Sequence, residues 1–218
     1  MYYSHVNFGQ TLIRYKVPND ILNWINNFYE NNAKDLYSAN NVLAGKIKKQ
    51  HALLYQDDVI DMKAHDRLPQ NIKNWFLETF SHYLNFTGHG HTDININSMW
   101  INEMESNEYN PVHVHTGKEI LGLSSVMFLK LPSSTGKEFS YEERPTNGQL
   151  IFLGSSTGHF AKVDYTPEVK VGDFFVFPYD LRHAVYPFNG TDEVRRTLSA
   201  NCDVRARNHK PKTKEEKK

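Results

Sequence analysis

The sequence predicts a mainly β protein, a sandwich or jelly-roll barrel, with helices from the N-terminal part packed on one sheet. From about Asn95 onward the chain consists of short β-rich runs divided by turn residues. No helical pattern alternates with these runs, which argues against βαβ units. Two stretches in the first ninety-odd residues instead carry apolar residues at helical spacing.

The first helix is expected after Pro18, where Asn19 or Asp20 would cap it. The second is expected after Pro69 and should end at Gly88 and Gly90. Aromatic residues in both stripes are interpreted as core residues. The stretch from about residue 34 to 62 is polar and irregular and predicts no element.

The expected strands are Ile96–Met104, Val112–His115, Leu123–Leu131, Gln149–Leu153, Phe160–Val163, Phe174–Phe177, Ala184–Tyr186 and Arg195–Val204. Several are apolar on both faces, so the helices should cover the outside of one sheet.

We expect one domain over residues 1–204, with a helical part (1–94) and a barrel (95–204). Residues 205–218 are charged, lack an apolar partner and predict a disordered tail.

Composition narrows the functional classes. The 25 Lys and Arg residues balance the 25 Asp and Glu residues, which argues against nucleic acid as a partner. The single cysteine, Cys202, excludes an internal disulfide framework and a cysteine-based zinc site. No apolar stretch predicts a signal peptide or a membrane span, so a cytoplasmic protein with no membrane partner is expected. Nothing in the composition favours a particular oligomer.

Three histidines predict a metal site. His113 and His115 stand at i and i+2 in an expected strand, so their side chains share one face. His183 follows another expected strand about seventy residues later. Neutral imidazole suits iron, zinc, copper and nickel, so residue type alone does not choose the metal. Three protein ligands with open positions point to a catalytic iron; ordinary surface or core histidines are the alternative.

The last expected strand suggests an anion site. It places Arg195, Thr197, Ser199 and Asn201 on one face. An arginine that points into a barrel needs a partner, and guanidinium binds carboxylate through two parallel charge-assisted bonds. A dicarboxylate ligand would supply that partner, and the hydroxyl of Thr197 could also bind it. A surface Arg195–Arg196 pair on an edge strand is the alternative.

An ordered series of motifs resembles a known family. It comprises Trp100-Ile-Asn102, Tyr109-Asn-Pro-Val-His113-Val-His115, Leu123 to Pro132, Val171-Gly-Asp173 to Pro178, His183-Ala-Val-Tyr-Pro187 and Arg195 to Asn201. This series, from about Ser98 to Asp203, resembles the iron(II)- and 2-oxoglutarate-dependent oxygenases, in particular a branch found in bacteria and their phages. The resemblance implies a double-stranded β-helix (jelly-roll) barrel.

The resemblance also implies roles for individual residues. His113 and His183 would bind Fe(II), and Arg195 with Thr197 would bind the distal carboxylate of 2-oxoglutarate. Trp100 and Asn102 would line the cosubstrate pocket. No catalytic residue beyond the metal centre is implied, and Gly172-Asp173 would form a tight turn.

The third ligand departs from the wider family, which usually has Asp or Glu at the position of His115. The narrower branch commonly has His-x-His, so His115 is the expected ligand. Glu119, four residues later, is the alternative carboxylate.

The implied activity is that of a dioxygenase. It would use O2 to decarboxylate 2-oxoglutarate to succinate and hydroxylate a C–H bond of a protein residue or small molecule, in the host cytoplasm if the chain is phage-encoded. A cupin-type metalloenzyme is the second possibility, with His113, His115 and Glu119 as ligands and Pro178, His183 and Asn189 as a loose second motif. A non-catalytic jelly-roll binding module is the third. Only the oxygenase requires Arg195 and Thr197.

Overall fold

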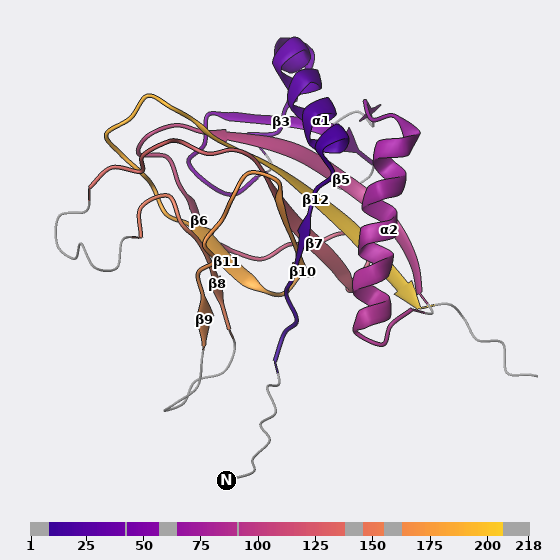
Figure 1. Ribbon diagram of the computed structural model, residues 1–218. Coiled ribbons are helices and arrows are strands. Elements are labelled where there is room, and N and C mark those ends of the chain that lie inside the picture. Colours follow the sequence, from indigo (N-terminus) through magenta and orange to yellow (C-terminus); the bar gives the residue numbers. More distant parts are fainter. Residues whose placement is uncertain are drawn as a thin grey trace, which may run out of the picture.

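The chain folds into two antiparallel sheets that face each other, with two helices on the outer side of the larger one (Figure 1). The computed structural model describes residues 9–41, 43–56, 65–90, 92–137, 146–154 and 163–206. Among these residues, no helix has both the length and the apolar character needed to cross a membrane.

The larger sheet has the order β1-β10-β7-β12-β5-β3-β2, with β4 paired to β3. Its strands are β1 (Ile13–Lys16), β2 (Tyr37–Ser38), β3 (Lys49–Tyr55), β4 (His65–Asp66), β5 (Thr92–Met104), β7 (Gly122–Lys130), β10 (Asp173–Pro178) and β12 (Arg195–Ala206). The middle strand, β12, pairs along its whole length with β5 and along most of it with β7. Every residue of β12 from Arg195 to Val204 is buried.

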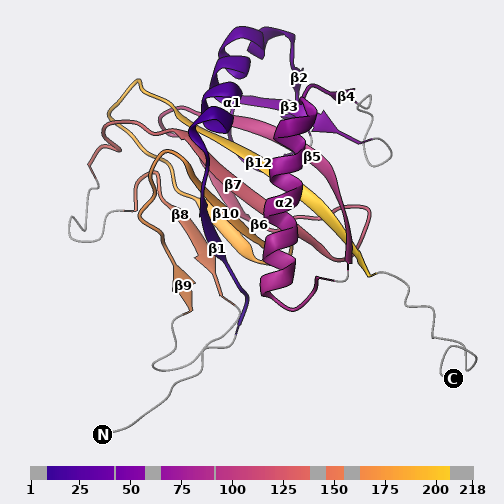
Figure 2. The same ribbon diagram turned by 45° about the vertical axis from the view of Figure 1, so that its right-hand side comes forward.

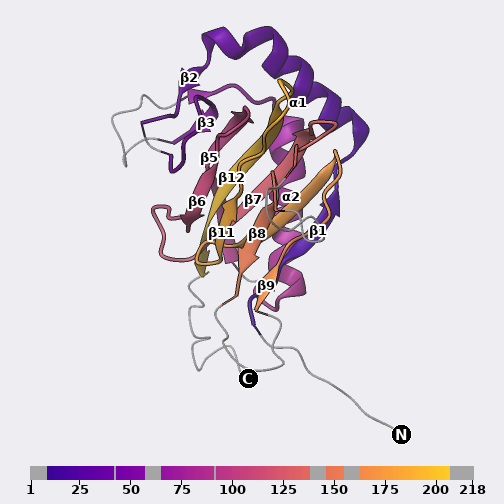
Figure 3. The same ribbon diagram turned by 90° about the vertical axis from the view of Figure 1, so that its left-hand side faces the viewer.

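The smaller sheet has the order β6-β11-β8-β9 and lies on the side of the larger sheet away from the helices (Figure 3). Its strands are β6 (Asn110–His113), β8 (Leu150–Leu153), β9 (Asp164–Tyr165) and β11 (Arg182–Val185). Although β6 and β11 are distant in the sequence, they pair directly, and His113 stands opposite His183.

Two hydrophobic cores hold these layers together. The helices α1 (Asn19–Asn32) and α2 (Gln70–Phe86) cover one face of the larger sheet (Figure 2), and a short 3-10 turn (Ala33–Asp35) follows α1. In the core beneath them, Phe174 of β10 touches the rings of Phe76 and Phe80. The second core, between the sheets, includes Phe152 and Phe177.

The expected architecture is confirmed: a mainly β fold whose helices cover one sheet. Both helices form where the apolar stripes predict them, and Gly88, with φ of 81°, follows the end of α2. The strands β5, β6, β7, β8, β10, β11 and β12 overlap the expected runs, but β6 ends at His113, so the expected strand does not extend to His115. Gly172, with φ of 85°, turns the chain into β10, and the buried carboxylate of Asp173 accepts a bond from the Lys170 N–H at 2.7 Å.

Other details differ from the expectation. The N-cap of α1 is Pro18, and neither Asn19 nor Asp20 caps the helix. The supposedly irregular stretch contains β2 and β3, because β3 is held by cross-strand pairing with β5 and not by local propensity. β12 runs two residues into the expected tail, to Ala206. Of the expected strand 160–163, only Val163 is described, and it precedes β9; residues 207–218 also lie outside the described part.

The packing predicts that Phe174→Ala lowers the free energy of unfolding by about 3–5 kcal/mol, because it removes a fully buried ring from the contact between α2 and the sheet. Denaturant titration measures this change. The exposed Phe86→Ala serves as the control and should change the value by less than about 0.5 kcal/mol. A loss below 1 kcal/mol for Phe174→Ala contradicts the described core.

Candidate metal centre

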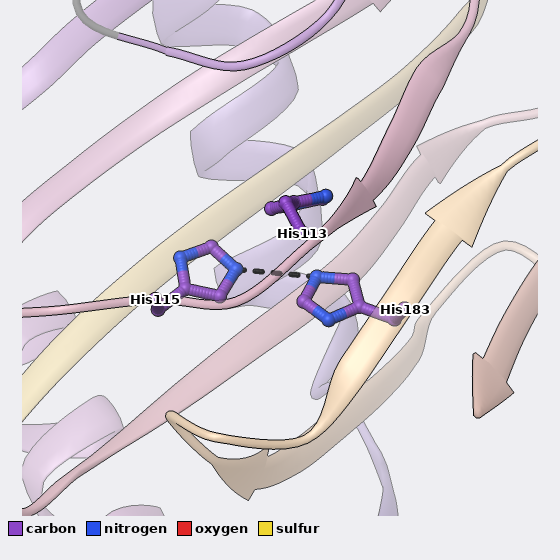
Figure 4. Close-up of side chains that lie close together, drawn as sticks. All are labelled: His113, His115 and His183. Carbon is purple, nitrogen blue, oxygen red and sulfur yellow. Dashed lines mark hydrogen bonds between the residues drawn. The ribbon is translucent and has the colours of Figure 1, made fainter. Parts of the chain in front are cut away.

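The three predicted histidines meet at one point (Figure 4). His113 ends β6, His115 lies in the loop that follows, and His183 lies in β11. One nitrogen from each ring lies within 4.8 Å of the other two. Nε2 of His115 is 3.2 Å from Nε2 of His183. The group could therefore hold a metal ion.

Backbone carbonyls orient two of the rings. Nδ1 of His113 lies 2.7 Å from the carbonyl oxygen of Pro111, and Nδ1 of His183 lies 2.9 Å from that of Leu181. A carbonyl accepts but cannot donate, so each Nδ1 carries the proton and each Nε2 keeps its lone pair. This arrangement is common for metal-ligating histidines, because it fixes the tautomer and the ring orientation.

The electrostatics also favour coordination. Burial lowers the pKa of His113, of His115 and, to about 4, of His183. For His115 the nearby charges of His183 and His113 lower the pKa further. The rings are therefore neutral at pH 7, which is the form that binds metals.

The spacing suits one ion. Two nitrogens that are each about 2.1 Å from a metal and at right angles to each other lie about 3 Å apart. The separation between His115 and His183, 3.2 Å, is close to this value. In contrast, the carboxylate of Glu119 is not part of the group and forms an ion pair with Arg205. The geometry therefore favours His115 over Glu119, and the cupin ligand set, which needs Glu119, is not assembled.

A cavity of about 260 Å³ opens beside the histidines. His113, His115 and Trp100 line it, and the ring centroids of Trp100 and His115 are 6.0 Å apart. A second part of the wall comes from the segment of residues 39–56, including Gln50 and Tyr55. No aspartate or glutamate is among the lining residues that the structure describes.

Arg195 points into the space between the sheets. Its guanidinium carbon lies 4.9 Å from the ring centre of Phe128, and the side chain is 3% exposed. Nε and Nη2 are buried and have no hydrogen-bond partner within the described residues. Burial lowers the pKa of Arg195 to about 10, so the group is still charged at pH 7. A buried, unpaired cation of this kind fits an anionic ligand.

Aromatic contacts connect Arg195 to the histidines through the inner core. Arg195 lies over Phe128, whose ring neighbours Phe175. Phe175 contacts Phe152, and Phe152 lies against His183, with ring centroids 6.0 Å apart. Arg195 and His183 therefore face the same space between the sheets, although neither lines the cavity.

The remaining predicted residues occupy the same inner surface. Thr197 is buried two positions from Arg195 and stands opposite Asn102 of β5. The amide of Asn102 accepts a bond from Gln50 at 3.0 Å and does not line the cavity. Neighbouring Arg196 points the other way, toward α1, where it pairs with Glu103 and Glu30. The predicted alternation along β12 is thus confirmed.

Comparison with known families supports this interpretation. Residues 98–201 match the family model described as "Putative 2OG-Fe(II) oxygenase". This part of the chain belongs to the 2OG-Fe(II) oxygenases. The match spans all three histidines and Arg195, and it indicates a 2-oxoglutarate-dependent Fe(II) oxygenase with Fe(II) and 2-oxoglutarate as its cofactors. The search of curated proteins gave no match.

Solved structures share the fold. A prolyl-4-hydroxylase from Pseudomonas putida is 14% identical with a TM-score of 0.55, covering 91% of this chain and 94% of that one. The carbocyclase SnoK of nogalamycin biosynthesis is 13% identical with a TM-score of 0.57, covering 91% and 83%. A prolyl hydroxylase from Trichoplax adhaerens, in complex with a peptide fragment of hypoxia inducible factor, is 10% identical with a TM-score of 0.53, covering 91% and 84%. At these identities the likeness establishes the jelly-roll fold alone.

The sequence analysis did not predict that residues from the segment 39–56 form part of the cavity wall. Gln50, Ala52 and Tyr55 of β3 line the cavity together with Gln56. A weak signal existed, since Ala52-Leu-Leu-Tyr55 is a short apolar run, but alanine and leucine are not typical of strands.

We predict that His183→Ala abolishes metal retention, because the remaining two imidazoles leave the ion without its ligand from β11. Metal analysis after anaerobic loading with Fe(II) measures the stoichiometry. The control is His89→Ala, which removes an exposed histidine after α2 and should leave the stoichiometry unchanged. Unchanged iron in His183→Ala would remove this residue from the ligand set.

We also predict that His115→Asp preserves or strengthens Fe(II) binding, because a carboxylate adds a negative charge next to the ion. His115→Asn is the control, since asparagine has about the size of aspartate but no charge. This variant should bind Fe(II) more weakly than His115→Asp. Dissociation constants measured anaerobically compare the variants. Complete metal loss in His115→Asp would show that the site depends on an imidazole there.

Proposed function

We propose that this oxygenase hydroxylates a C–H bond of a protein residue or small molecule and decarboxylates 2-oxoglutarate to succinate. His113, His115 and His183 would hold Fe(II), and Arg195 with Thr197 would bind the distal carboxylate of 2-oxoglutarate. The observation that carries the proposal is a three-histidine cluster together with a buried guanidinium that faces the same space and has no hydrogen-bond partner among the described residues. When bound, the iron would supply the reaction of O2 with 2-oxoglutarate that delivers one oxygen atom to the substrate.

Charge explains why a dianionic cosubstrate suits this site. Three neutral imidazoles leave the full charge of Fe(II) uncompensated, and Arg195 adds a further positive charge. A carboxylate ligand would remove part of that charge, but none is present in the histidine group. A dicarboxylate brings two negative charges, one for each positive centre.

The cavity beside the histidines would receive the substrate. Trp100 and Tyr55 give it aromatic surfaces, and the amides of Gln50 and Asn97 give it hydrogen-bonding groups. No aspartate or glutamate lines it within the described part of the chain. A neutral or anionic group should therefore enter more readily than a cation. The peptide bound by the Trichoplax prolyl hydroxylase makes a protein residue one reasonable substrate.

An anaerobic titration tests the proposal. Fe(II) and 2-oxoglutarate should together produce an absorption band that neither produces alone, because the cosubstrate binds the iron directly. The band should be absent in His183→Ala. If the protein binds iron but shows no band that depends on 2-oxoglutarate, the proposed activity is wrong and a metalloenzyme that does not use 2-oxoglutarate is favoured. If it binds neither, a non-catalytic binding module is favoured.

We predict that Arg195→Ala raises the half-saturating concentration of 2-oxoglutarate more than about a hundredfold, because removing one partner of a buried charge pair costs about 3–5 kcal/mol. Iron content should not change. The intensity of the absorption band during 2-oxoglutarate titration measures the effect. A shift below about threefold contradicts the proposed anchor.

Arg196→Ala is a matched control, because Arg196 is also buried but pairs with Glu103 on the helix side. It should lower the free energy of unfolding and leave the 2-oxoglutarate requirement within about threefold. Arg195→Ala should destabilise the ligand-free protein less than Arg196→Ala does, because it removes a buried charge that has no hydrogen-bond partner among the described residues.

A further inference from the structure

His115 is held differently from the other two histidines. It lies beyond the end of β6, and within the described residues no carbonyl holds its ring as Pro111 and Leu181 hold the rings of His113 and His183. Its backbone N–H instead donates to the carbonyl of Tyr179 at 2.9 Å. The position of this imidazole therefore depends on how the loop of residues 114–121 is attached to the barrel.

The carboxylate of Asp203, on β12, attaches that loop. Asp203 is 5% exposed. Its Oδ2 accepts a bond from the N–H of Lys118 at 3.3 Å, and its Oδ1 accepts one from the N–H of Glu119 at 3.4 Å. A Cβ built on Gly117 would lie 1.9 Å from Oδ1, so the loop backbone rests directly on the carboxylate. Both bonds are long, but their acceptor is a buried charge, which strengthens them.

Tyr179, which follows β10, connects Asp203 to both ends of the loop. Its hydroxyl donates to Oδ1 of Asp203 at 3.3 Å and accepts from the amide of Asn97 at 2.9 Å. Its backbone carbonyl holds His115, and its backbone N–H donates to the carbonyl of Gly122 at 3.0 Å. Asp203 and Tyr179 thus fix the loop at His115, at 118–119 and at Gly122.

We propose that Asp203 is a positioning residue for His115, acting through the backbone of the loop and not by contact with the metal. The carboxylate is not a member of the histidine group. Loss of its charge should free the loop and move the imidazole of His115 away from the other two. The proposal rests on the proposed function in one respect, that His115 is a metal ligand.

Asp203→Asn tests this proposal by equilibrium titration with Co(II) alone, a redox-stable ion that binds imidazole. The asparagine amide has one acceptor oxygen instead of two, and its NH2 group would face one of the two loop N–H groups. The bonds from the N–H groups of Lys118 and Glu119 therefore cannot both form. Removing an outer partner of this kind weakens metal binding about 10–100-fold. The same loss is expected in Asp203→Asn, together with a change in the Co(II) absorption spectrum.

A matched control separates positioning from general stability. Asp173 is also a fully buried carboxylate and caps a turn, at Lys170, at the opposite end of β10 from Tyr179. Asp173→Asn should lower the free energy of unfolding while the Co(II) dissociation constant stays within about twofold. Equal losses of affinity in the two variants would overturn the proposal.

A double-mutant cycle shows whether the effect passes through His115. In a His115→Ala background, Asp203→Asn should weaken Co(II) binding less than about twofold further. If Asp203→Asn does not fold, Gly117→Ala provides the second test, since its Cβ pushes the loop off the intact carboxylate, and a tenfold loss is expected. The same loss of affinity with and without His115 overturns the proposal.

The two hypotheses fail in different ways. If the wild-type protein binds no Co(II) that depends on His183, the proposed function fails, and the role of Asp203 fails with it. If the wild type binds Co(II) through His183 and Asp203→Asn binds it with unchanged affinity and spectrum, only the positioning role is wrong.

Discussion

The pairing of β6 with β11 is the constraint on which the site depends. In this register His113 stands opposite His183, so two imidazoles from distant parts of the sequence lie side by side. A slip of one residue would turn one of them to the opposite face. The inner core holds His183 in place, because its ring packs against Phe152 of the neighbouring strand β8 and Phe177 of β10 in the opposite sheet. Metal binding would thus use a geometry that folding has already established.

The central strand β12 organises the rest of the inner surface. Its helix-facing side is conventional: Leu198 and Ala200 join the core, and Arg196 is fully paired. Its inner side carries Arg195 at one end, whose guanidinium has no hydrogen-bond partner in the described part of the chain, and the loop-binding carboxylate of Asp203 at the other. Polar groups at buried positions cost stability unless they are paired. Asp203 is paired with the loop and Tyr179, whereas Arg195 would gain its partner only from the proposed binding of 2-oxoglutarate.

The sequence predicts those parts of the molecule in which local pattern and tertiary structure agree. The apolar stripes of α1 and α2 and the alternation around Arg195 and Thr197 are of this kind. The strand β3 is not, because pairing with β5 imposes it on residues with weak strand preference. His115 is an instructive case. Strand periodicity predicted its direction, but β6 ends at His113, and His115 is held beside the other two histidines by the bond from its backbone N–H to the carbonyl of Tyr179.

An anaerobic crystal soak with Fe(II) and 2-oxoglutarate tests the central claim most directly. The account predicts one iron ion bound by the imidazoles of His113, His115 and His183, with a carboxylate of 2-oxoglutarate against the guanidinium of Arg195. Iron bound elsewhere, or 2-oxoglutarate bound away from Arg195, would contradict it.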